Sequence, residues 1–291
     1  CMNQRLLLCC DLDRTLLPNG PQDESPNARR LFRELAQLPA VVLVYVSGRD
    51  LALLQAAIAD YGLPLPQYAV GDAGSTVYRF GNDRWESLPA WDAQIAPDWG
   101  GHEHDELQQW CIEFPELALQ EPAKQNTYKL SYYTELGVDW QNLIARLRVR
   151  LQAQGIRTSI VWSLDETAGT GLLDILPASA TKLHAVRFLL AQTQTPDSNL
   201  VYAGDSGNDL PVLGSGLQSV LVANAPAEVR QEAKTRLQNN DLSDRLYLAR
   251  GDFLGMNGNY AAGVLEGVAH FFPEKLDWMR KVVNQWQAEP K

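Results

Sequence analysis

Two short runs of apolar residues, 5–10 and 41–46, are each followed by a segment whose apolar residues recur at helical spacing. Runs that are apolar throughout are typical of strands buried on both faces. Strands that alternate with helices indicate a parallel sheet covered by helices. Because the same alternation returns over residues 181–272, we predict an α/β protein with a Rossmann-like parallel sheet as its core.

The middle of the chain has a different pattern. Helical spacing over residues 103–114 and 139–153 lies among strand-like segments at 127–134, 157–163 and 171–176. The first of these strands alternates between polar and apolar residues, as a half-exposed strand of an antiparallel sheet does. We therefore expect an α+β cap domain inserted into the core. We place the cap at residues 88–177 and the core at residues 2–87 and 178–291.

The composition fits a globular protein and excludes several classes of function. Hydrophobic residues make up 45% of the 291 residues, which argues against disorder. The net charge of −10 argues against a nucleic-acid-binding protein. No apolar run approaches the roughly 18 residues of a membrane helix, and the N-terminal run is too short for a secretory leader. We expect a cytoplasmic protein in which Cys9, Cys10 and Cys111 are buried and reduced.

Two carboxylates, Asp11 and Asp13, directly follow the first predicted strand. Ligands of open α/β sheets bind beyond the carboxyl ends of the strands, where these side chains would share one crevice. Like charges placed together need a compensating cation, and a hard divalent metal with oxygen ligands is the natural one. For such a pair taken alone, a solvated turn rich in Asp is the alternative.

Three further polar elements follow the strands or begin the helices of the same sheet. Ser47-Gly48-Arg49 joins the second strand to a helix, an arrangement that suits an anionic oxygen but is also an ordinary turn. Lys182 begins the helix after the insertion, where a solvated surface lysine is the alternative. A turn with Asp205 and Asp209 follows a later strand. Four such elements in one sheet favour a joint site over four separate turns.

Together these residues predict phosphoryl transfer. One Asp attacks phosphorus and becomes an aspartyl-phosphate, and a second acts as general acid and then as general base. Ser and Lys hold the phosphoryl oxygens, while Mg²⁺ offsets the developing charge.

The ordered set DLDRT, SGR, Lys182 and GDSGND resembles the four motifs of the haloacid dehalogenase (HAD) superfamily. Its Asp-x-Asp form is that of the superfamily's phosphatases, and the insertion is similar to the C2B (IIB) type of cap. The segments AVGDAGSTVY, NTYKLSYY, LLDILPASATK and AAGVLEGVAHF resemble those of sucrose-6-phosphate phosphatases and the related mannosylfructose-phosphate phosphatases. The resemblance spans about residues 5–272 and points to the sucrose-6-phosphate phosphatase family.

This resemblance implies roles for the acidic residues. Asp11 would be the nucleophile and a Mg²⁺ ligand. Asp13 would be the general acid and base, with its backbone carbonyl on the metal. Asp205 would be the third protein ligand, and Asp209 would complete the metal site and orient Lys182.

The resemblance also implies how the phosphoryl group is bound. Ser47, Gly48 and Lys182 would hold its oxygens, with Asn208 close by and Arg49 beside it. Ser47 stands where the family more often has Thr, and it keeps the hydroxyl. For Arg49, capping or surface pairing is the alternative to a substrate contact.

The cap would recognise the sugar. Sugar hydroxyls favour polar side chains placed to bond in pairs. By the resemblance, the glucosyl unit would be bound by Gln125, Asn126, Lys129, Ser131 and Asp174. A polar, exposed sheet face is the alternative for each of these residues.

We therefore expect a Mg²⁺-dependent phosphatase that hydrolyses a disaccharide phosphate, sucrose 6-phosphate first, through an aspartyl-phosphate. A phosphatase for mannosylfructose phosphate or for another sugar phosphate would share the same core. A non-catalytic sugar-phosphate-binding or partner subunit is the alternative of another class, although a binder need not keep both a nucleophile and an acid. The glycosyltransferase that makes the phosphorylated disaccharide is the protein partner that this interpretation suggests; nucleic acids and membranes are not expected as partners.

Overall fold

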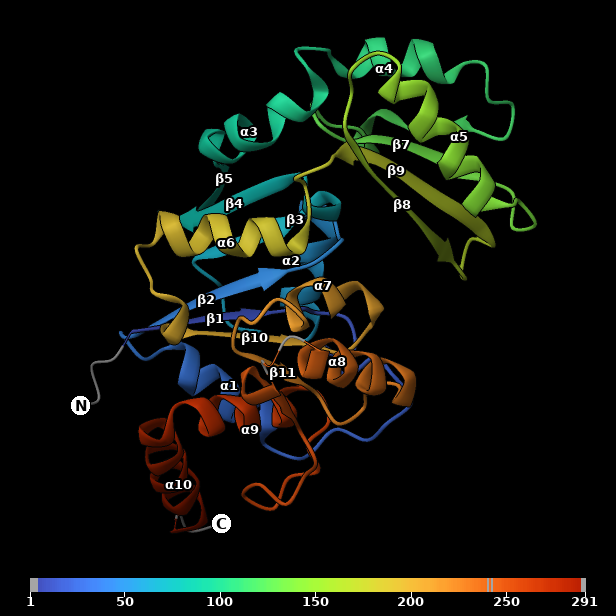
Figure 1. The fold of residues 1–291 in the computed structure, drawn as a ribbon. Helices are drawn as coiled ribbons and strands as arrows, with labels where there is room; N and C mark the ends of the chain where they lie inside the picture. Colours follow the sequence, from blue (N-terminus) through green and yellow to red (C-terminus); the bar gives the residue numbers. More distant parts are fainter. Residues whose placement is uncertain (1–4, 240, 242, 289–291) are drawn as a thin grey trace.

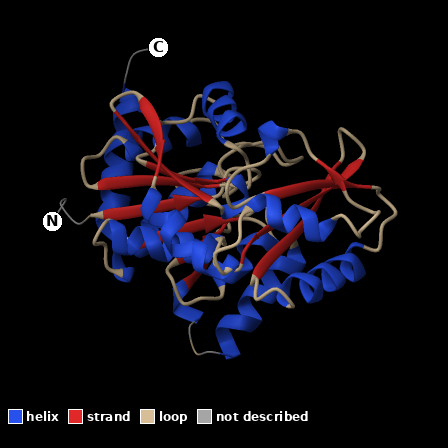
Figure 2. Ribbon diagram, turned by 90° about the horizontal axis from the view of Figure 1, so that it is seen from above, coloured by secondary structure: helices blue, strands red, loops and turns tan. Residues whose placement is uncertain are grey.

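The computed structural model describes residues 5–239, 241 and 243–288 and contains two separate β-sheets. The larger sheet forms the core, and the smaller one belongs to a cap, drawn mostly in green above and beside the core (Figure 1). Seen from above, the strands of the two sheets form separate groups flanked by helices (Figure 2). The predicted fold class, a Rossmann-like α/β core with an inserted α+β cap, is confirmed.

The core sheet has the strand order β12-β11-β10-β1-β2-β3-β4-β5. Its parallel strands are β1 (Leu6–Cys10), β2 (Val41–Val46), β3 (Tyr68–Gly71), β10 (Leu200–Gly204), β11 (Ser219–Leu221) and β12 (Leu246–Leu248). An antiparallel hairpin extends it through β4 (Thr76–Gly81) and β5 (Arg84–Ser87). The strand order reverses at β1, because β2 lies on one side of it and β10 on the other. Open α/β sheets bind ligands at such a reversal.

Helices cover both faces of the core sheet. One face is packed by α1 (Ala28–Ala36), α2 (Leu51–Asp60), α9 (Ala261–Phe271) and α10 (Pro273–Ala288). The other is packed by α3 (Pro89–Ile95), α6 (Lys182–Gln192), α7 (Leu210–Leu213) and α8 (Ala227–Asn239). Side chains alternate along β1, so Cys10 enters the first cluster and Cys9 the second. Both thiols are buried and free, as is Cys111.

Helix α3 lies within the segment predicted to be cap, yet it packs on the core. Trp91 and Ile95 are buried in the same cluster as α6, and the rings of Trp91 and Phe188 lie 5.2 Å apart. The local sequence does not predict this helix, because seven residues that begin with Pro89 are too few to show a helical repeat. We propose that the cap begins after α3 rather than at residue 88.

The cap is a four-stranded antiparallel sheet with helices on one face. Its order is β6-β7-β9-β8, formed by β6 (Ala118–Leu119), β7 (Leu130–Thr134), β8 (Thr158–Asp165) and β9 (Thr170–Pro177). The helices α4 (His104–Cys111) and α5 (Trp140–Gln152) pack on it through a third apolar cluster. Residues at alternate positions point to the opposite face, among them Ser131 and its cross-strand partner Asp174. That open face carries residues predicted to bind the sugar.

The last helix, α10, packs on α1 and α9. Met279 and Val282 are buried in the cluster that these helices share. The guanidinium of Arg30 lies 4.2 Å from the centroid of the Trp286 ring. Among the described helices, none is long and apolar enough to cross a membrane.

Candidate active site

The carboxyl ends of three neighbouring strands bring the predicted motifs to one edge of the core sheet. Asp11 follows β1, and its backbone N–H donates to the carbonyl of Ala203 on β10 at 2.9 Å. Ser47 follows β2, and Asp205 follows β10. Lys182 reaches the same edge from the first turn of α6. Segments far apart in the sequence therefore converge at the reversal point of the sheet.

Lys182 pairs with two carboxylates. Its Nζ lies 2.9 Å from Oδ1 of Asp209 and 3.2 Å from Oδ1 of Asp11. Although burial works in the opposite direction, these carboxylates raise the pKa of Lys182, which stays a cation. Burial raises the pKa of Asp11 well above its ordinary value; Lys182 opposes this rise, and Asp209 adds to it. A fully ionised Asp11 therefore requires more positive charge than Lys182 supplies alone.

Asp209 is fully buried, and both of its carboxylate oxygens accept hydrogen bonds. Oδ1 accepts from Nζ of Lys182 at 2.9 Å and from the hydroxyl of Tyr202 at 2.5 Å. Oδ2 accepts from the backbone N–H groups of Asp205 at 3.0 Å and Ser206 at 3.2 Å. Although burial opposes ionisation, these donors, Lys182 foremost, lower the pKa of Asp209. Asp209 is thus an ionised anchor for both the lysine and the turn after β10.

Three carboxylates form a candidate metal centre. Asp11, Asp205 and Asp209 each place an oxygen within 4.8 Å of the others. The hydroxyl of Thr15 donates to Oδ1 of Asp205 at 3.1 Å. Burial and the neighbouring Asp209 raise the pKa of Asp205 to about 6. Lys182 pairs with two of these three carboxylates, so the group has an excess of negative charge. An all-oxygen donor set of this kind fits a hard divalent cation.

Asp13 is held outside this cluster by Arg49. Nε of Arg49 donates to Oδ2 of Asp13 at 3.0 Å, and Nη2 donates to Oδ1 at 2.7 Å. Nδ2 of Asn19 donates to the same Oδ1 at 2.8 Å. Although partial burial works against it, these bonds lower the pKa of Asp13. Of the roles left open for Arg49, the structure shows an ion pair, with Asp13 as its partner.

The remaining residues predicted for the phosphoryl group lie on two turns. Ser47 is buried, and its Oγ accepts from the backbone N–H of Arg49 at 3.1 Å. A Cβ at Gly48 would meet nothing within 4 Å, so a ligand can approach this part of the backbone closely. Asn208 is exposed on the 3₁₀ turn Gly207–Asp209 that follows β10.

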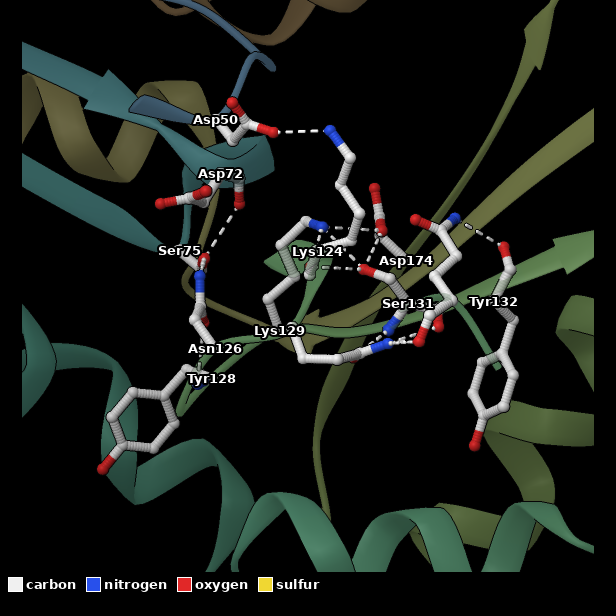
Figure 3. A network of polar contacts seen from close by, with 12 residues as sticks. Asp50, Asp72, Ser75, Lys124, Asn126, Tyr128, Lys129, Ser131, Tyr132 and Asp174 are labelled. Atoms are coloured by element: carbon white, nitrogen blue, oxygen red, sulfur yellow. Dashed lines mark hydrogen bonds and ion pairs between the residues drawn. The ribbon is translucent and has the colours of Figure 1, made fainter. Parts of the chain in front are cut away.

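Three of the residues predicted for the sugar form a hydrogen-bonded cluster on the open face of the cap sheet (Figure 3). Nζ of Lys129 donates to Oγ of Ser131 at 2.6 Å and to the carbonyl of Lys124 at 2.8 Å. It also lies 3.4 Å from Oδ1 of Asp174. Ser131 in turn donates to Oδ1 of Asp174 at 2.6 Å. Lysine, hydroxyl and carboxylate therefore satisfy one another in the structure.

The other two residues predicted for the sugar bind the protein itself. Nε2 of Gln125 donates to the carbonyls of Gln120 at 3.0 Å and Ser131 at 2.9 Å, while its Oε1 accepts from the backbone N–H of Ser131 at 2.9 Å. Nδ2 of Asn126 donates to Oγ of Ser75 in the core at 3.2 Å. Gln125 thus fixes one end of β7, and Asn126 joins the cap to the core.

A second bridge between cap and core is an ion pair. Nζ of Lys124 lies 2.7 Å from Oδ2 of Asp50, and Oδ1 of Asp50 caps α2 by accepting from the backbone N–H of Leu53 (Figure 3). Beside this bridge is a cleft of about 530 Å³ between the two domains, the size of a small-molecule site. Its polar walls include Asp50, Asp72, Ser75, Tyr78, Lys124, Gln125 and Asn126.

Sequence reasoning missed Thr15, Tyr202 and the Lys124–Asp50 pair. Thr15 stands within the first motif, so its hydroxyl was a visible indication. Tyr202 lies in an apolar strand, where an aromatic residue is normally core. Nothing in the local pattern marks Lys124 or Asp50 as partners, because they are brought together only by the packing of cap on core.

Comparisons with known proteins find relatives along most of the chain. The family model described as sucrose-6F-phosphate phosphohydrolase matches residues 4–272. A HAD-like hydrolase of Nitrosococcus oceani is 56% identical over 278 residues, covering 96% of this chain and 75% of that protein. Sucrose-phosphatase 1 of Nicotiana tabacum is 27% identical, covering 92% of this chain but only 59% of that protein. The sucrose-phosphatase of Synechocystis sp. PCC6803, solved in complex with sucrose and phosphate, has a TM-score of 0.68 and 26% identity, covering 92% of this chain and 98% of that one.

Proposed function

This chain belongs to the sucrose-6F-phosphate phosphohydrolase family of HAD-type phosphoric monoester hydrolases, and we propose that it is a Mg²⁺-dependent phosphatase acting on a disaccharide phosphate. The proposed substrate is sucrose 6-phosphate, which would yield sucrose and inorganic phosphate. The Synechocystis structure with sucrose and phosphate supports this substrate. The all-oxygen acidic cluster supports the metal.

One observation carries the proposal. The buried carboxylate of Asp11 faces the ammonium of Lys182 within a group of three carboxylates, where the strand order of the core sheet reverses. Phosphoryl transfer needs an attacking oxygen, a cation for the phosphoryl oxygens and a donor set for a divalent metal. Asp11, Lys182 and the acidic group would supply these three parts.

In the proposed reaction, a carboxylate oxygen of Asp11 attacks phosphorus while the bond from phosphorus to the sugar oxygen breaks. Asp13 gives its proton to the departing sugar oxygen. Water then attacks phosphorus in the aspartyl-phosphate and gives a proton to Asp13. The bond from phosphorus to Asp11 breaks, which releases inorganic phosphate and restores both carboxyl groups.

The other residues of the site would hold the phosphoryl group and the metal. Bound Mg²⁺ would offset charge on the phosphoryl oxygens. Its protein ligands would be the carboxylates of Asp11 and Asp205 and the backbone carbonyl of Asp13. Since both oxygens of Asp209 are already hydrogen-bonded, we propose that Asp209 anchors Lys182 rather than binding the metal directly. Lys182, Ser47 and the backbone of Gly48 would bind the remaining phosphoryl oxygens, with Asn208 nearby.

Arg49 would control the protonation state of Asp13. The bidentate pair keeps Asp13 ionised, which suits a general base. A general acid must instead carry a proton. An arriving phosphoryl group competes for the guanidinium of Arg49, and we propose that this competition frees Asp13 to take up a proton from solvent water and then act as the acid. Arg49 would thereby become the substrate contact that the sequence analysis considered.

The cap would bind the glucosyl unit through Lys129, Ser131 and Asp174. These groups already form good hydrogen bonds with one another, so sugar hydroxyls would have to insert between them or replace them. Gln125 and Asn126 would act indirectly. The amide of Gln125 bonds to the backbone of β7, and the amide of Asn126 bonds to Ser75 of the core.

The substitution Asp11→Asn tests the mechanism. It keeps the shape of the side chain and removes the nucleophile, so Mg²⁺-dependent phosphate release should fall by at least about a thousandfold. The melting curve followed by circular dichroism should stay cooperative. Asp60→Asn, at the exposed end of α2, is the control and should keep full activity. Normal turnover by the Asp11→Asn protein would refute the aspartyl-phosphate mechanism.

A panel of phosphorylated sugars tests the substrate. We expect kcat/KM for sucrose 6-phosphate to exceed that for hexose monophosphates by at least about tenfold, because a monosaccharide lacks the second sugar unit whose hydroxyls would bond to the cap. Equal rates would reject the disaccharide, and a higher rate on mannosylfructose phosphate would reassign the substrate. Tight binding without phosphate release would favour a non-catalytic binding subunit.

A further inference from the structure

The buried hydroxyl of Tyr202 contacts the carboxylate of Asp209, which belongs to the proposed phosphoryl-transfer site. Tyr202 lies on β10, two positions before the glycine that ends the strand, and it is fully buried. Its hydroxyl donates to Oδ1 of Asp209 at 2.5 Å. That oxygen is the one that also accepts from Nζ of Lys182 at 2.9 Å. The tyrosine and the lysine therefore share a single carboxylate oxygen.

The surroundings leave the Asp209 carboxylate little freedom. Its other oxygen accepts from the backbone N–H groups that follow β10. Gly204 lets the carboxylate approach the strand, because a Cβ at this position would lie only 2.5 Å from Oδ2 of Asp209. Without the hydroxyl of Tyr202, Oδ1 would keep Lys182 as its partner but lose the donor that fixes it from the sheet side. The carboxylate could then tilt, and the lysine would move with it.

We propose that Tyr202 is a positioning residue, whose hydroxyl fixes Asp209 and thereby holds the ammonium of Lys182 beside Asp11. The inference rests on the proposed phosphatase function for its chemistry, but its geometry stands without it. The lysine acts on charge that develops during transfer, so an error in its position affects the transition state more than the bound substrate. The expected signature is a change in kcat rather than in KM.

Tyr45 is a matched control in the same sheet. It lies on β2, is also fully buried, and donates its hydroxyl to the carbonyl of Pro64 at 2.6 Å. It packs into the cluster on one face of the sheet, whereas Tyr202 packs into the cluster on the other. Tyr45→Phe and Tyr202→Phe therefore remove the same atom from similar burial, and only the second removes a bond to the site.

The experiment compares both variants in the full chain with Mg²⁺ and sucrose 6-phosphate. Tyr202→Phe should lower kcat by about tenfold, because hydrogen bonds to charged groups are among the strong ones and this one holds the anchor of Lys182, and it should leave KM within about twofold. Tyr45→Phe should leave both constants within about twofold. In a Lys182→Met background, adding Tyr202→Phe should have no further effect, because the tyrosine acts through the lysine. Should Tyr202→Phe not fold, Tyr202→Met, whose flexible side chain can fill the space, replaces it.

Crystal structures of the wild type and Tyr202→Phe provide a readout that does not depend on turnover. We expect the Asp209 carboxylate to rotate and Nζ of Lys182 to move away from Asp11. If the wild type releases no phosphate, the proposed function fails, and these structures still decide the role of Tyr202. The inference is overturned if Asp209 and Lys182 keep their positions, if kcat of Tyr202→Phe stays within about twofold of the wild type, or if its loss persists in the Lys182→Met background.

Discussion

Lys182 in the core and Lys129 in the cap are both largely withdrawn from solvent, with side chains 18% and 9% exposed. Each ammonium lies in a cluster that also contains carboxylate and hydroxyl groups. In the core, Lys182 contacts Asp209 and Asp11. In the cap, Lys129 contacts Asp174 and the hydroxyl of Ser131. The two clusters therefore use the same chemistry, but they differ in charge balance.

The core cluster is unbalanced, because it contains three carboxylates but only one lysine, which pairs with two of them. Burial raises the pKa of both Asp11 and Asp205, as expected for acids that lack sufficient positive charge around them. The cap cluster pairs one lysine with one carboxylate and satisfies both with hydrogen bonds. This difference in charge supports the proposal that the core cluster binds a cation together with a phosphoryl group, and that the cap cluster exchanges hydrogen bonds with a neutral sugar.

Replacing each lysine in turn should have the largest effect and tests whether the two clusters act on different parts of the substrate. Lys182→Met should lower kcat/KM by about a hundredfold to a thousandfold on every phosphate ester, because it removes a cation from the developing charge. Lys129→Met should lower kcat/KM by about tenfold on sucrose 6-phosphate and leave hydrolysis of p-nitrophenyl phosphate unchanged, because this small ester has no sugar to bind. Steady-state kinetics with both substrates make the measurement.

Equal losses on both substrates for Lys129→Met would contradict the proposal that the cap cluster binds only the sugar. So would a loss confined to the sugar substrate for Lys182→Met. Arg79→Met, on the exposed β4–β5 hairpin, serves as a control for removing a cation from the surface and should leave both substrates unaffected.

The dependence of metal binding on pH provides a second test of the difference in charge between the two clusters. In the metal-free fold, burial raises the pKa of Asp205 from 3.8 to about 6. The folded chain then binds a proton more readily than the unfolded one, so this group adds stability as the pH falls from 7 towards 5. Mg²⁺ competes with that proton. Millimolar Mg²⁺ should raise Tm by roughly 5 °C near pH 7.5 and by clearly less near pH 5.

Differential scanning calorimetry at both pH values, with and without Mg²⁺, measures this effect. Asp205→Asn should abolish the rise in Tm at both pH values, whereas Asp174→Asn in the balanced cap cluster should leave it intact. A rise that is equal at both pH values would show that no acid of raised pKa takes part in binding the metal.

The core cluster was more predictable from sequence than the cap cluster, and the reason is geometric. Asp11, Ser47 and Asp205 each follow a strand of a parallel sheet, and carboxyl ends of neighbouring parallel strands must meet at one edge. In the strand predicted at residues 127–134, Lys129 and Ser131 are two positions apart and so share one face. Their meeting with Asp174 depends on the register between β7 and β9, which the sequence does not specify locally.

Side-chain partners were harder to foresee than positions. Gln125 has the composition of a sugar ligand, but its amide bonds to the backbone of its own cap. Arg49 could be assigned to the motif but not to Asp13, because their pairing depends on two rotamers meeting across a turn. Tyr202 was hidden for the opposite reason, since a buried aromatic residue in a strand needs no function to explain it.

The smallest predicted effect concerns the ion pair that links the two regions. Lys124 and Asp50 are partly exposed, with side chains 34% and 21% accessible, so the pair contributes only modestly to the docking of the cap on the core.

Because Asp50 also caps α2, Lys124→Met is the cleaner test: it breaks the bridge without disturbing the helix. We expect kcat/KM for sucrose 6-phosphate to fall by about twofold to fivefold, and the wild type to approach the variant as salt screens the pair. Hydrolysis of p-nitrophenyl phosphate should not change, since that reaction needs the core but not a docked cap. A larger loss that salt does not reduce would mean that Lys124 contacts the substrate directly, and Lys124 would then belong to the proposed sugar site as well as to the bridge between cap and core.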